Sequence, residues 1–95
     1  IIPEKFYVSD NYPNPFNPST NFYIDVPEAG NLIVRIYDVS GRLVNELINT
    51  KVVAGRINSR WSGKDSYGMM LPTGIYFLQV ETGLHYHVQK LALVK

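Results

Sequence analysis

The sequence predicts an all-β domain of about seven strands that form an antiparallel β-sandwich. Apolar and polar residues alternate with a period of two along most of the chain, as in strands with one buried face. Turn residues interrupt this alternation about every eight to twelve positions, which is the spacing of strands in a sandwich. The chain contains no internal repeat, low-complexity tract or long helical pattern. These observations together favour the all-β class.

Size and composition fit one small globular domain and exclude several classes of function. The chain has 95 residues, of which 45% are hydrophobic and 13% aromatic, as is typical of a folded module. Its nine Lys and Arg are scattered and its net charge is +1, so it lacks the basic stripe of a nucleic-acid-binding protein. Its apolar runs are too short to span a membrane. Because Cys is absent, disulfides, thiol catalysis and cysteine metal sites are excluded.

The first residues predict a linker followed by the domain itself. We expect residues 1–4 to be the remnant of a linker from a larger parent protein, and residues 5–95 to form a single sandwich domain. The start of the chain does not resemble a signal peptide, because no basic segment precedes a long apolar one. Any export signal of that kind is therefore expected on the parent chain. Residues 5–8 predict a short opening strand.

Residues 12–20, YPNPFNPST, combine three prolines with two aromatic residues. Proline lacks an N–H group and keeps the residue before it out of the helical region. We therefore expect residues 12–18 to be extended, without ladder hydrogen bonds, in a crossing between the sheets or along an edge. Tyr12 and Phe16 are expected to anchor this crossing by packing, so the segment is interpreted as part of the domain.

Two long strands and a tight hairpin follow. Residues 20–27 and 31–38 each alternate in hydrophobicity, and Pro27 ends the first of them because it cannot donate to a ladder. Residues 38–42, DVSGR, have the composition of a hairpin turn, in which Gly41 is free to adopt a positive φ.

The second half of the chain predicts three further strands after the hairpin partner. Residues 42–49 could be interpreted as a short helix, but a strand with a bulge is favoured because so tight a turn joins antiparallel neighbours. Residues 56–61 predict the next strand, and residues 62–74 form the longest loop, with three Gly and one Pro. Residues 75–81 and 85–94 are expected to close the domain as a hairpin.

Candidate metal ligands are few. His85 and His87 lie two apart, so their side chains are expected on one face of a strand, where they could share a metal. Glu81 is the only acidic residue nearby that is in phase, and a site needs a third or fourth ligand. We therefore predict two surface histidines and no metal site.

Acidic residues and nucleophiles also lack a catalytic pattern. Asp65, with Asp38 and Glu81, could bind calcium or serve as an acid–base pair, but the sequence DSYG is also an ordinary turn. The alternating acidic residues of a calcium loop are absent, so the turn is favoured. No Ser has the context of a nucleophile elbow, and no phosphate loop or cofactor motif is present. The sequence predicts no enzyme and no cofactor.

The aromatic residues allow a carbohydrate-binding alternative, because flat rings on a sandwich face stack on sugars. Trp61 is expected in the core, since it shares a strand face with Ile57. The better candidates for exposed rings are Tyr7, Tyr23, Tyr37 and Tyr67. Sequence alone does not establish that these rings lie on one plane.

Four segments within residues 8–95 resemble the C-terminal sorting domain of the type IX (Por) secretion system. In order, they read NYPNPFNPST, PEAGNLIVRIYDVSGRLVNEL, GKDSYGMMLPTGIYFLQVETG and QKLALVK. The middle of the chain also resembles the immunoglobulin-like domain of flagellar hook-capping proteins. The shared pattern consists of Trp61, Gly63, Asp65, Gly74, Tyr76 and Leu78.

This resemblance implies an immunoglobulin-like sandwich at the C-terminus of a larger secreted protein, such as a hydrolase or adhesin. In that family the secretion machinery recognises the domain in the periplasm and carries the protein across the outer membrane. A sortase-like protease then commonly removes the domain and anchors the cargo at the cell surface. Matched by position, the sorting-motif residues are Tyr12, Pro13, Asn14, Pro15, Gly41, Arg42, Gly74, Tyr76, Lys90, Leu91, Leu93 and Lys95.

The final strand and the alternatives complete the sequence-based hypotheses. If residues 90–95, KLALVK, lie at a sheet edge, they offer free backbone groups to a receptor. Two other functions stay open: a structural or carbohydrate-binding accessory domain of a secreted hydrolase, and self-assembly like that of hook-capping relatives. We expect a monomer without a membrane span.

Overall fold

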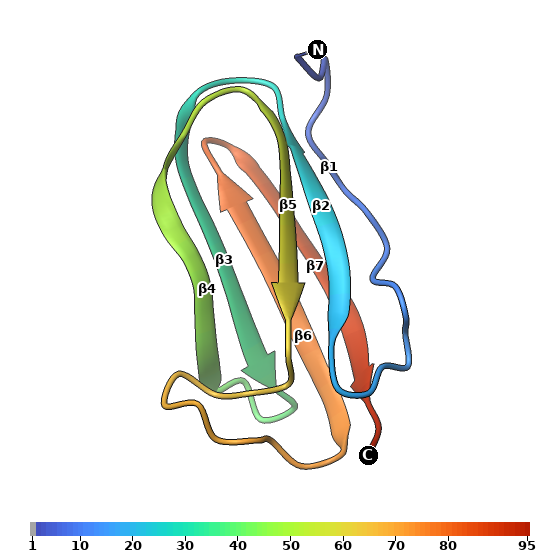
Figure 1. Ribbon diagram of the computed structural model, residues 1–95. Coiled ribbons are helices and arrows are strands. Elements are labelled where there is room, and N and C mark those ends of the chain that lie inside the picture. The colour runs from blue at the N-terminus through green and yellow to red at the C-terminus, as the bar shows by residue number, and fades with distance from the viewer. Residues whose placement is uncertain (1) are drawn as a thin grey trace.

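The computed structural model describes residues 2–95, which form seven strands (Figure 1). The strands are β1 Tyr7–Val8, β2 Thr20–Val26, β3 Gly30–Asp38, β4 Leu43–Val52, β5 Gly55–Trp61, β6 Gly74–Thr82 and β7 His85–Leu93. The predicted all-β class and number of strands are confirmed. The opening strand is shorter than the expected residues 5–8. Of the expected linker at residues 1–4, Ile1 lies outside the described residues.

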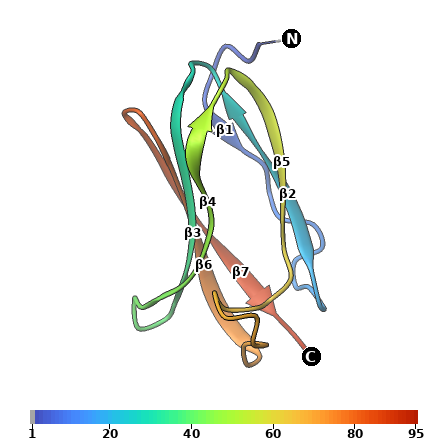
Figure 2. The same cartoon turned by 60° about the vertical axis from the view of Figure 1, so that its left-hand side comes forward.

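The strands form two antiparallel sheets packed face to face (Figure 2). One sheet has three strands in the order β1-β2-β5, and the other has four in the order β4-β3-β6-β7. Neighbouring strands pair antiparallel throughout. This arrangement confirms the immunoglobulin-like sandwich. Among residues 2–95 there is no helix of the length and apolar character that crossing a membrane requires.

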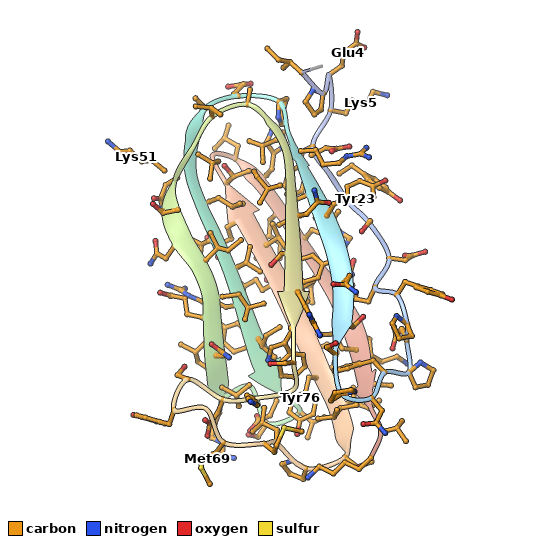
Figure 3. All side chains as sticks on the ribbon, viewed as in Figure 1. Glu4, Lys5, Tyr23, Lys51, Met69 and Tyr76 are labelled. Carbon is orange, nitrogen blue, oxygen red and sulfur yellow. The ribbon has the colours of Figure 1, made fainter. Side chains whose placement is uncertain are left out.

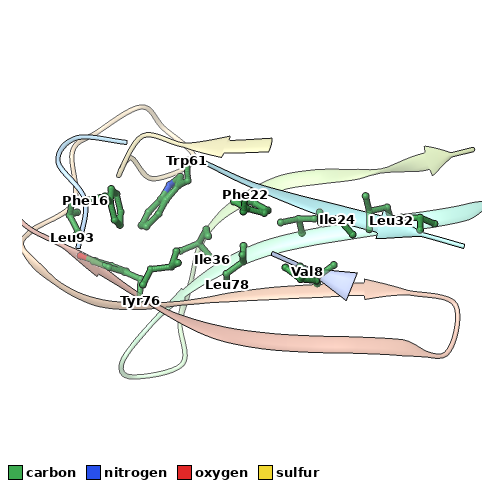
Figure 4. Packing of buried hydrophobic residues seen from close by; sticks show 14 residues of the cluster. Val8, Phe16, Phe22, Ile24, Leu32, Ile36, Trp61, Tyr76, Leu78 and Leu93 are labelled. Carbon is green, nitrogen blue, oxygen red and sulfur yellow. The ribbon is translucent and has the colours of Figure 1, made fainter. Parts of the chain in front are cut away.

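The core lies between the sheets and is built by the alternation seen in the sequence. In β2, β3 and β6 every second residue is buried, as strand geometry requires. Figure 4 shows part of this apolar layer. Its fully buried aromatic and aliphatic members include Trp61, Phe16, Ile24, Leu32, Ile36, Leu78, Leu91 and Leu93. The expected burial of Trp61 is thus confirmed.

Residues 12–18 cross from the three-stranded sheet to the four-stranded sheet, as expected. Tyr12 lies beside β2 and pairs with its residue Asn21 through two backbone hydrogen bonds of 2.9 Å. Phe16 forms a parallel bridge with Leu93 of β7. The expectation of no ladder bonds is therefore wrong at these two positions. Proline explains why pairing is confined to them, since Pro13, Pro15 and Pro18 have no N–H to donate. The peptide bonds before these three prolines are cis.

The two aromatic residues of this crossing have opposite environments. Phe16 is 1% exposed and packs in the core, whereas Tyr12 is 81% exposed. Phe16 anchors the segment as predicted, but the prediction that Tyr12 does so by packing is wrong. Tyr12 is held instead by its backbone hydrogen bonds to Asn21, and its ring faces solvent.

The segment after the first hairpin is a strand, as favoured over a helix. β4 pairs with β3 along its length, with irregularities in register between Val34 and Arg35 and between Ile36 and Tyr37. These irregularities match the expected bulge and explain why the apolar residues of β4 lack a clean alternation.

Loops cover the outer edges of the four-stranded sheet at one end of the molecule. At the β4 edge, the N–H of Ser66 donates to the carbonyl of Val44 at 3.0 Å, and the Asn45 side chain donates to the carbonyl of Lys64 at 2.8 Å. At the β7 edge, the proline segment covers the strand in the same way, through the hydrogen bonds between Phe16 and residues 92–94. Covered edges hinder the pairing of sheets from different molecules.

Candidate functional site

The residues that match the sorting motifs converge at the end of the sandwich where the chain terminates (Figure 1). Strand pairing brings Gly74 opposite Leu93, and Tyr76 opposite both Leu91 and Asp38, which begins the turn that contains Gly41 and Arg42. The bridge between Phe16 and Leu93 adds the proline segment. Motifs spread over the whole sequence therefore form one surface, which we call the terminal face: residues 12–18, 38–42, 62–76 and 90–95.

An aromatic cluster supports the terminal face from inside (Figure 4). The ring centroid of Trp61 lies 5.5 Å from that of Phe16 and 5.4 Å from that of Tyr76, both within the range of favourable aromatic pairs. The Trp61 Nε1–H donates to the Lys64 carbonyl at 2.9 Å, and the Tyr76 hydroxyl donates to the Pro72 carbonyl at 2.7 Å. Burial, and then the charge of Asp38, raise the pKa of Tyr76. These rings thus connect the core to the loop above it.

Gly63 allows the loop to approach the final strand closely. Its φ is +72°, which favours glycine, and a Cβ built on it would lie 3.2 Å from Cδ1 of Leu93 and 3.4 Å from the Pro18 carbonyl oxygen. A side chain at this position would therefore push against both the proline segment and β7. This contact gives a physical reason for glycine at position 63 of the hook-capping pattern.

Asp38 organises the hairpin turn of the terminal face. Its Oδ1 accepts hydrogen bonds from the Ser40 hydroxyl at 2.7 Å and from the Ser40 and Arg42 N–H groups at 3.0 Å. The bond from the Ser40 hydroxyl, followed by that from the Arg42 N–H, lowers the pKa of Asp38 to about 2. Gly41 has a φ of 86°, as the turn predicted. Asp38 therefore has a structural role, and the Arg42 side chain, 81% exposed, projects outward beside it.

Asp65 organises the longest loop in a similar way. Its Oδ1 accepts hydrogen bonds from the N–H groups of Tyr67 and Met69, each at 2.9 Å, and its carbonyl accepts from Gly68 at 3.1 Å. This is the geometry of a turn that begins with Asp. The interpretation as a turn rather than a calcium loop agrees with these contacts.

The proline segment is joined to the last strand by hydrogen bonds. The Asn14 side chain donates to the Lys90 carbonyl at 3.3 Å and accepts from the Ala92 N–H at 3.0 Å. The Phe16 N–H donates to the Ala92 carbonyl at 2.9 Å, and the Phe16 carbonyl accepts from the Val94 N–H at 3.0 Å. β7 does lie at a sheet edge, but the expected free backbone groups at its end are paired. Sequence reasoning missed these contacts.

The motif positions divide into buried residues that build the terminal face and exposed residues that line it. Leu91, Leu93 and Tyr76 are at most 5% exposed. Gly74 lies in the β6 ladder opposite Leu93 and is half-buried. The exposed positions are Tyr12, Pro13, Asn14, Pro15, Gly41, Arg42, Lys90 and Lys95. A partner molecule would therefore meet polar, basic and proline side chains.

The two histidines lie away from the terminal face, at the start of β7. The His85 ring stacks on Phe6 with centroids 4.9 Å apart, and His87 Nε2 is hydrogen-bonded to Gln89 Oε1 at 2.7 Å. Within residues 2–95 no group of three or more His, Asp or Glu side chains is arranged to hold a metal ion. These contacts account for both side chains in structural terms.

The candidate tyrosines for sugar stacking do not form one platform. Tyr23 lies on the three-stranded sheet (Figure 3), where its ring centroid is 6.0 Å from that of Tyr7 and the Arg56 guanidinium carbon lies 3.8 Å above it. Tyr37 belongs to β3 of the other sheet, and Tyr67 to the loop at the terminal face. Tyr7 and Tyr67 are exposed, as expected, but Tyr23 and Tyr37 are half-buried, so the four rings do not form one exposed surface.

Comparison with known proteins finds relatives of the same fold. The chain matches a segment of PorU from Porphyromonas gingivalis with a TM-score of 0.72 and 24% identity, over 95% of this chain and 9% of PorU. It also matches PorZ from the same organism, an essential bacterial surface component of the type IX secretion system, with a TM-score of 0.58 and 23% identity, over 97% of this chain and 12% of PorZ. At these identities the matches establish a shared fold.

A further structural match is FlgD from P. aeruginosa, with a TM-score of 0.60 and 30% identity, over 78% of this chain and 58% of FlgD. The chain spans only part of each of these proteins. A search of curated proteins found no match. Residues 15–84 match the family described as the FlgD Ig-like domain, which includes the Trp61-to-Leu78 pattern. Since this match covers most of the chain, the protein belongs to the family of FlgD Ig-like domains.

Proposed function

We propose that this domain is a noncatalytic module that targets a larger protein for type IX secretion across the outer membrane and supports its anchoring at the cell surface. Its partners are the secretion machinery, a sortase-like protease and the covalently attached parent protein, to which residues 1–4 serve as a linker. The domain acts in the periplasm during transit and then at the cell surface. It requires no cofactor and functions as a monomer.

The convergence of the sorting-motif positions carries this proposal. Asn14 and Lys90, 76 residues apart in the sequence, are in hydrogen-bond contact, and the turn at Gly41 lies at the same end of the sandwich. A receptor can therefore engage all the motifs at one surface. The shared fold with segments of PorU and PorZ, the latter a component of this secretion system, supports the same function.

Burial divides the motif into structural and recognition positions. Leu91 and Leu93 are 0% and 1% exposed, so they hold the last strand against the core. Lys90 and Lys95 are exposed on the terminal face. The two lysines are thus the recognition positions within residues 90–95, since charged rim residues steer association and set specificity.

An export assay with charge-reversed variants tests the proposal. The chain is fused to the C-terminus of a fluorescent reporter that has a periplasmic signal peptide, in a bacterium with a type IX system. The wild-type fusion should reach the cell surface or medium. The double variant Lys90→Glu/Lys95→Glu should remain in the periplasm while its melting temperature is unchanged, because both positions are exposed.

A matched control reverses two lysines elsewhere. Lys5 and Lys51 are exposed at the opposite end of the sandwich (Figure 3), so Lys5→Glu/Lys51→Glu should leave export intact. Deleting residues 90–95 is a weaker test, because it also removes Leu91 and Leu93 from the core. Retention of the wild-type fusion in the periplasm, or normal export of the Lys90/Lys95 variant, would contradict the proposal.

A further inference from the structure

The proline segment and the last strand form one hydrogen-bonded unit, although they lie near opposite ends of the sequence. Four backbone groups on the outer edge of β7 and just beyond it are paired with residues 14–16. The pairs are Lys90 O with Asn14 Nδ2, Ala92 N with Asn14 Oδ1, Ala92 O with Phe16 N, and Val94 N with Phe16 O. We call residues 14–16 the edge clamp.

Asn14 supplies through its side chain what a neighbouring strand supplies through its backbone. An Asn amide carries one acceptor oxygen and two donor hydrogens, and here one bond of each kind reaches β7. The residues on either side, Pro13 and Pro15, cannot donate from the backbone. Between these two prolines, the Asn14 side chain supplies both a donor and an acceptor and so continues the pairing that Phe16 begins.

The clamp covers only the terminal part of the β7 edge. Backbone N–H and C=O groups of an edge strand point away from the sheet at every second residue. In β7 these residues include Lys90 and Ala92, whose backbone groups bond to the clamp. By the same alternation, Tyr86 and Val88 also point outward. Within residues 2–95 neither has a hydrogen bond from a further strand or loop. The clamp is therefore specific to the segment that carries the terminal sorting positions.

From this geometry we propose that the element recognised by the secretion machinery is a composite surface, made of the edge clamp together with residues 90–95, in which Asn14 is the positioning residue. This inference rests on the proposed function. An edge strand whose outer backbone groups are unpaired tends to open locally, so a receptor would have to order it on binding at a cost in affinity. The clamp orders Lys90 and the residues after it in advance, and adds the exposed Pro15 to the surface presented.

Amide hydrogen exchange tests the clamp itself. In Asn14→Ala the Ala92 N–H loses its acceptor, so its exchange should become roughly tenfold faster, as expected for the loss of one hydrogen bond. Asn17→Ala is the matched control, because Asn17 also precedes a proline and is exposed, and within residues 2–95 its side chain forms no hydrogen bond. Equal exchange at Ala92 in the two variants would overturn the assignment of Asn14.

The reporter assay tests whether the clamp is part of the recognised surface. Asn14→Ala should lower the exported fraction severalfold, whereas Asn17→Ala should not. Leu47→Ala provides a control for stability: Leu47 is half-buried on β4, at the opposite edge of the same sheet, so this variant is destabilised without any change at the clamp. Reduced export in Asn14→Ala but not in Leu47→Ala would separate positioning from a general loss of stability.

The outcomes distinguish this inference from the function on which it rests. If Asn14→Ala speeds exchange at Ala92 but is exported like Asn17→Ala, the composite surface is wrong while sorting by the domain stands. The same holds if Leu47→Ala loses export as strongly as Asn14→Ala. If the wild-type fusion stays in the periplasm, the proposed function fails and the composite surface with it.

Discussion

Phe16→Ala should destabilise the domain strongly, because the proline segment is anchored in the core by this ring alone. Phe16 is 1% exposed and its centroid lies 5.5 Å from that of Trp61. Replacing a buried Phe by Ala costs about 3–5 kcal/mol, including the cavity that is left. A domain of this length is stable by only about 5–14 kcal/mol. We therefore expect a loss of about a fifth or more of the free energy of unfolding.

Chemical and thermal unfolding measure this loss. The fluorescence of the single Trp reports the core next to Phe16, and circular dichroism reports the strands independently. The melting temperature should fall by at least about 12 °C, since each kcal/mol corresponds to about 4–8 °C in a domain of this size. Tyr12→Ala is the control in the same segment and should cost under about 0.5 kcal/mol, as its ring is 81% exposed. A loss below about 1 kcal/mol in Phe16→Ala would refute the view that residues 12–18 are part of the fold.

Three further substitutions test the terminal face. Gly63→Ala should lower the free energy of unfolding by about 1–3 kcal/mol, because its Cβ would lie 3.2 Å from Leu93 at a positive φ. Gly74→Ala is the control and should lower it much less, because a Cβ there would have no neighbour within 4 Å. Equal urea midpoints in the two variants would contradict this contrast. Asp38 has its pKa lowered to about 2 in the folded state, so its contribution is present above the ordinary value of 3.8 and is lost as pH falls from 3.8 to about 2. Asp38→Asn should therefore show a flatter pH dependence of the urea midpoint in that range, and an unchanged slope would count against the turn contacts. Asp65→Ala removes the acceptor of two N–H bonds, so limited proteolysis should cut its loop faster than in the wild type, and an identical cleavage rate would exclude that role.

Strand positions could be predicted well from the sequence because local chemistry determines them. Pro27 follows the last residue of β2, and Gly41 has the positive φ that the turn requires. The alternation in β3 matches its burial residue by residue. The secondary structure of β4 was harder to predict, because its register irregularities disturb the alternation of apolar and polar residues. Where one face of a strand packs on the core, a hydrophobic period of two is sufficient to predict which of its residues are buried.

The environments of the proline segment could not be predicted in the same way. Tyr12 and Phe16 are both aromatic and stand four positions apart, yet one is exposed and the other is buried. Without a regular repeat, the direction of each side chain depends on the course of the crossing between sheets. Asn14 presented the same difficulty, because its partners Lys90 and Ala92 lie more than seventy positions away.

By itself, the sequence determined the all-β class, the turns, most strand boundaries, the core position of Trp61 and the resemblance that led to the family. These features follow from hydrophobic period, turn residues and local motif spacing, which act over a few neighbouring positions. Only the tertiary structure decided that the sorting-motif positions form one terminal face and that the edge of β7 is closed by residues 14–16. Such contacts depend on how two sheets pack and on which sheet edge a distant segment reaches. Local patterns in the chain do not specify contacts between residues so far apart in the sequence.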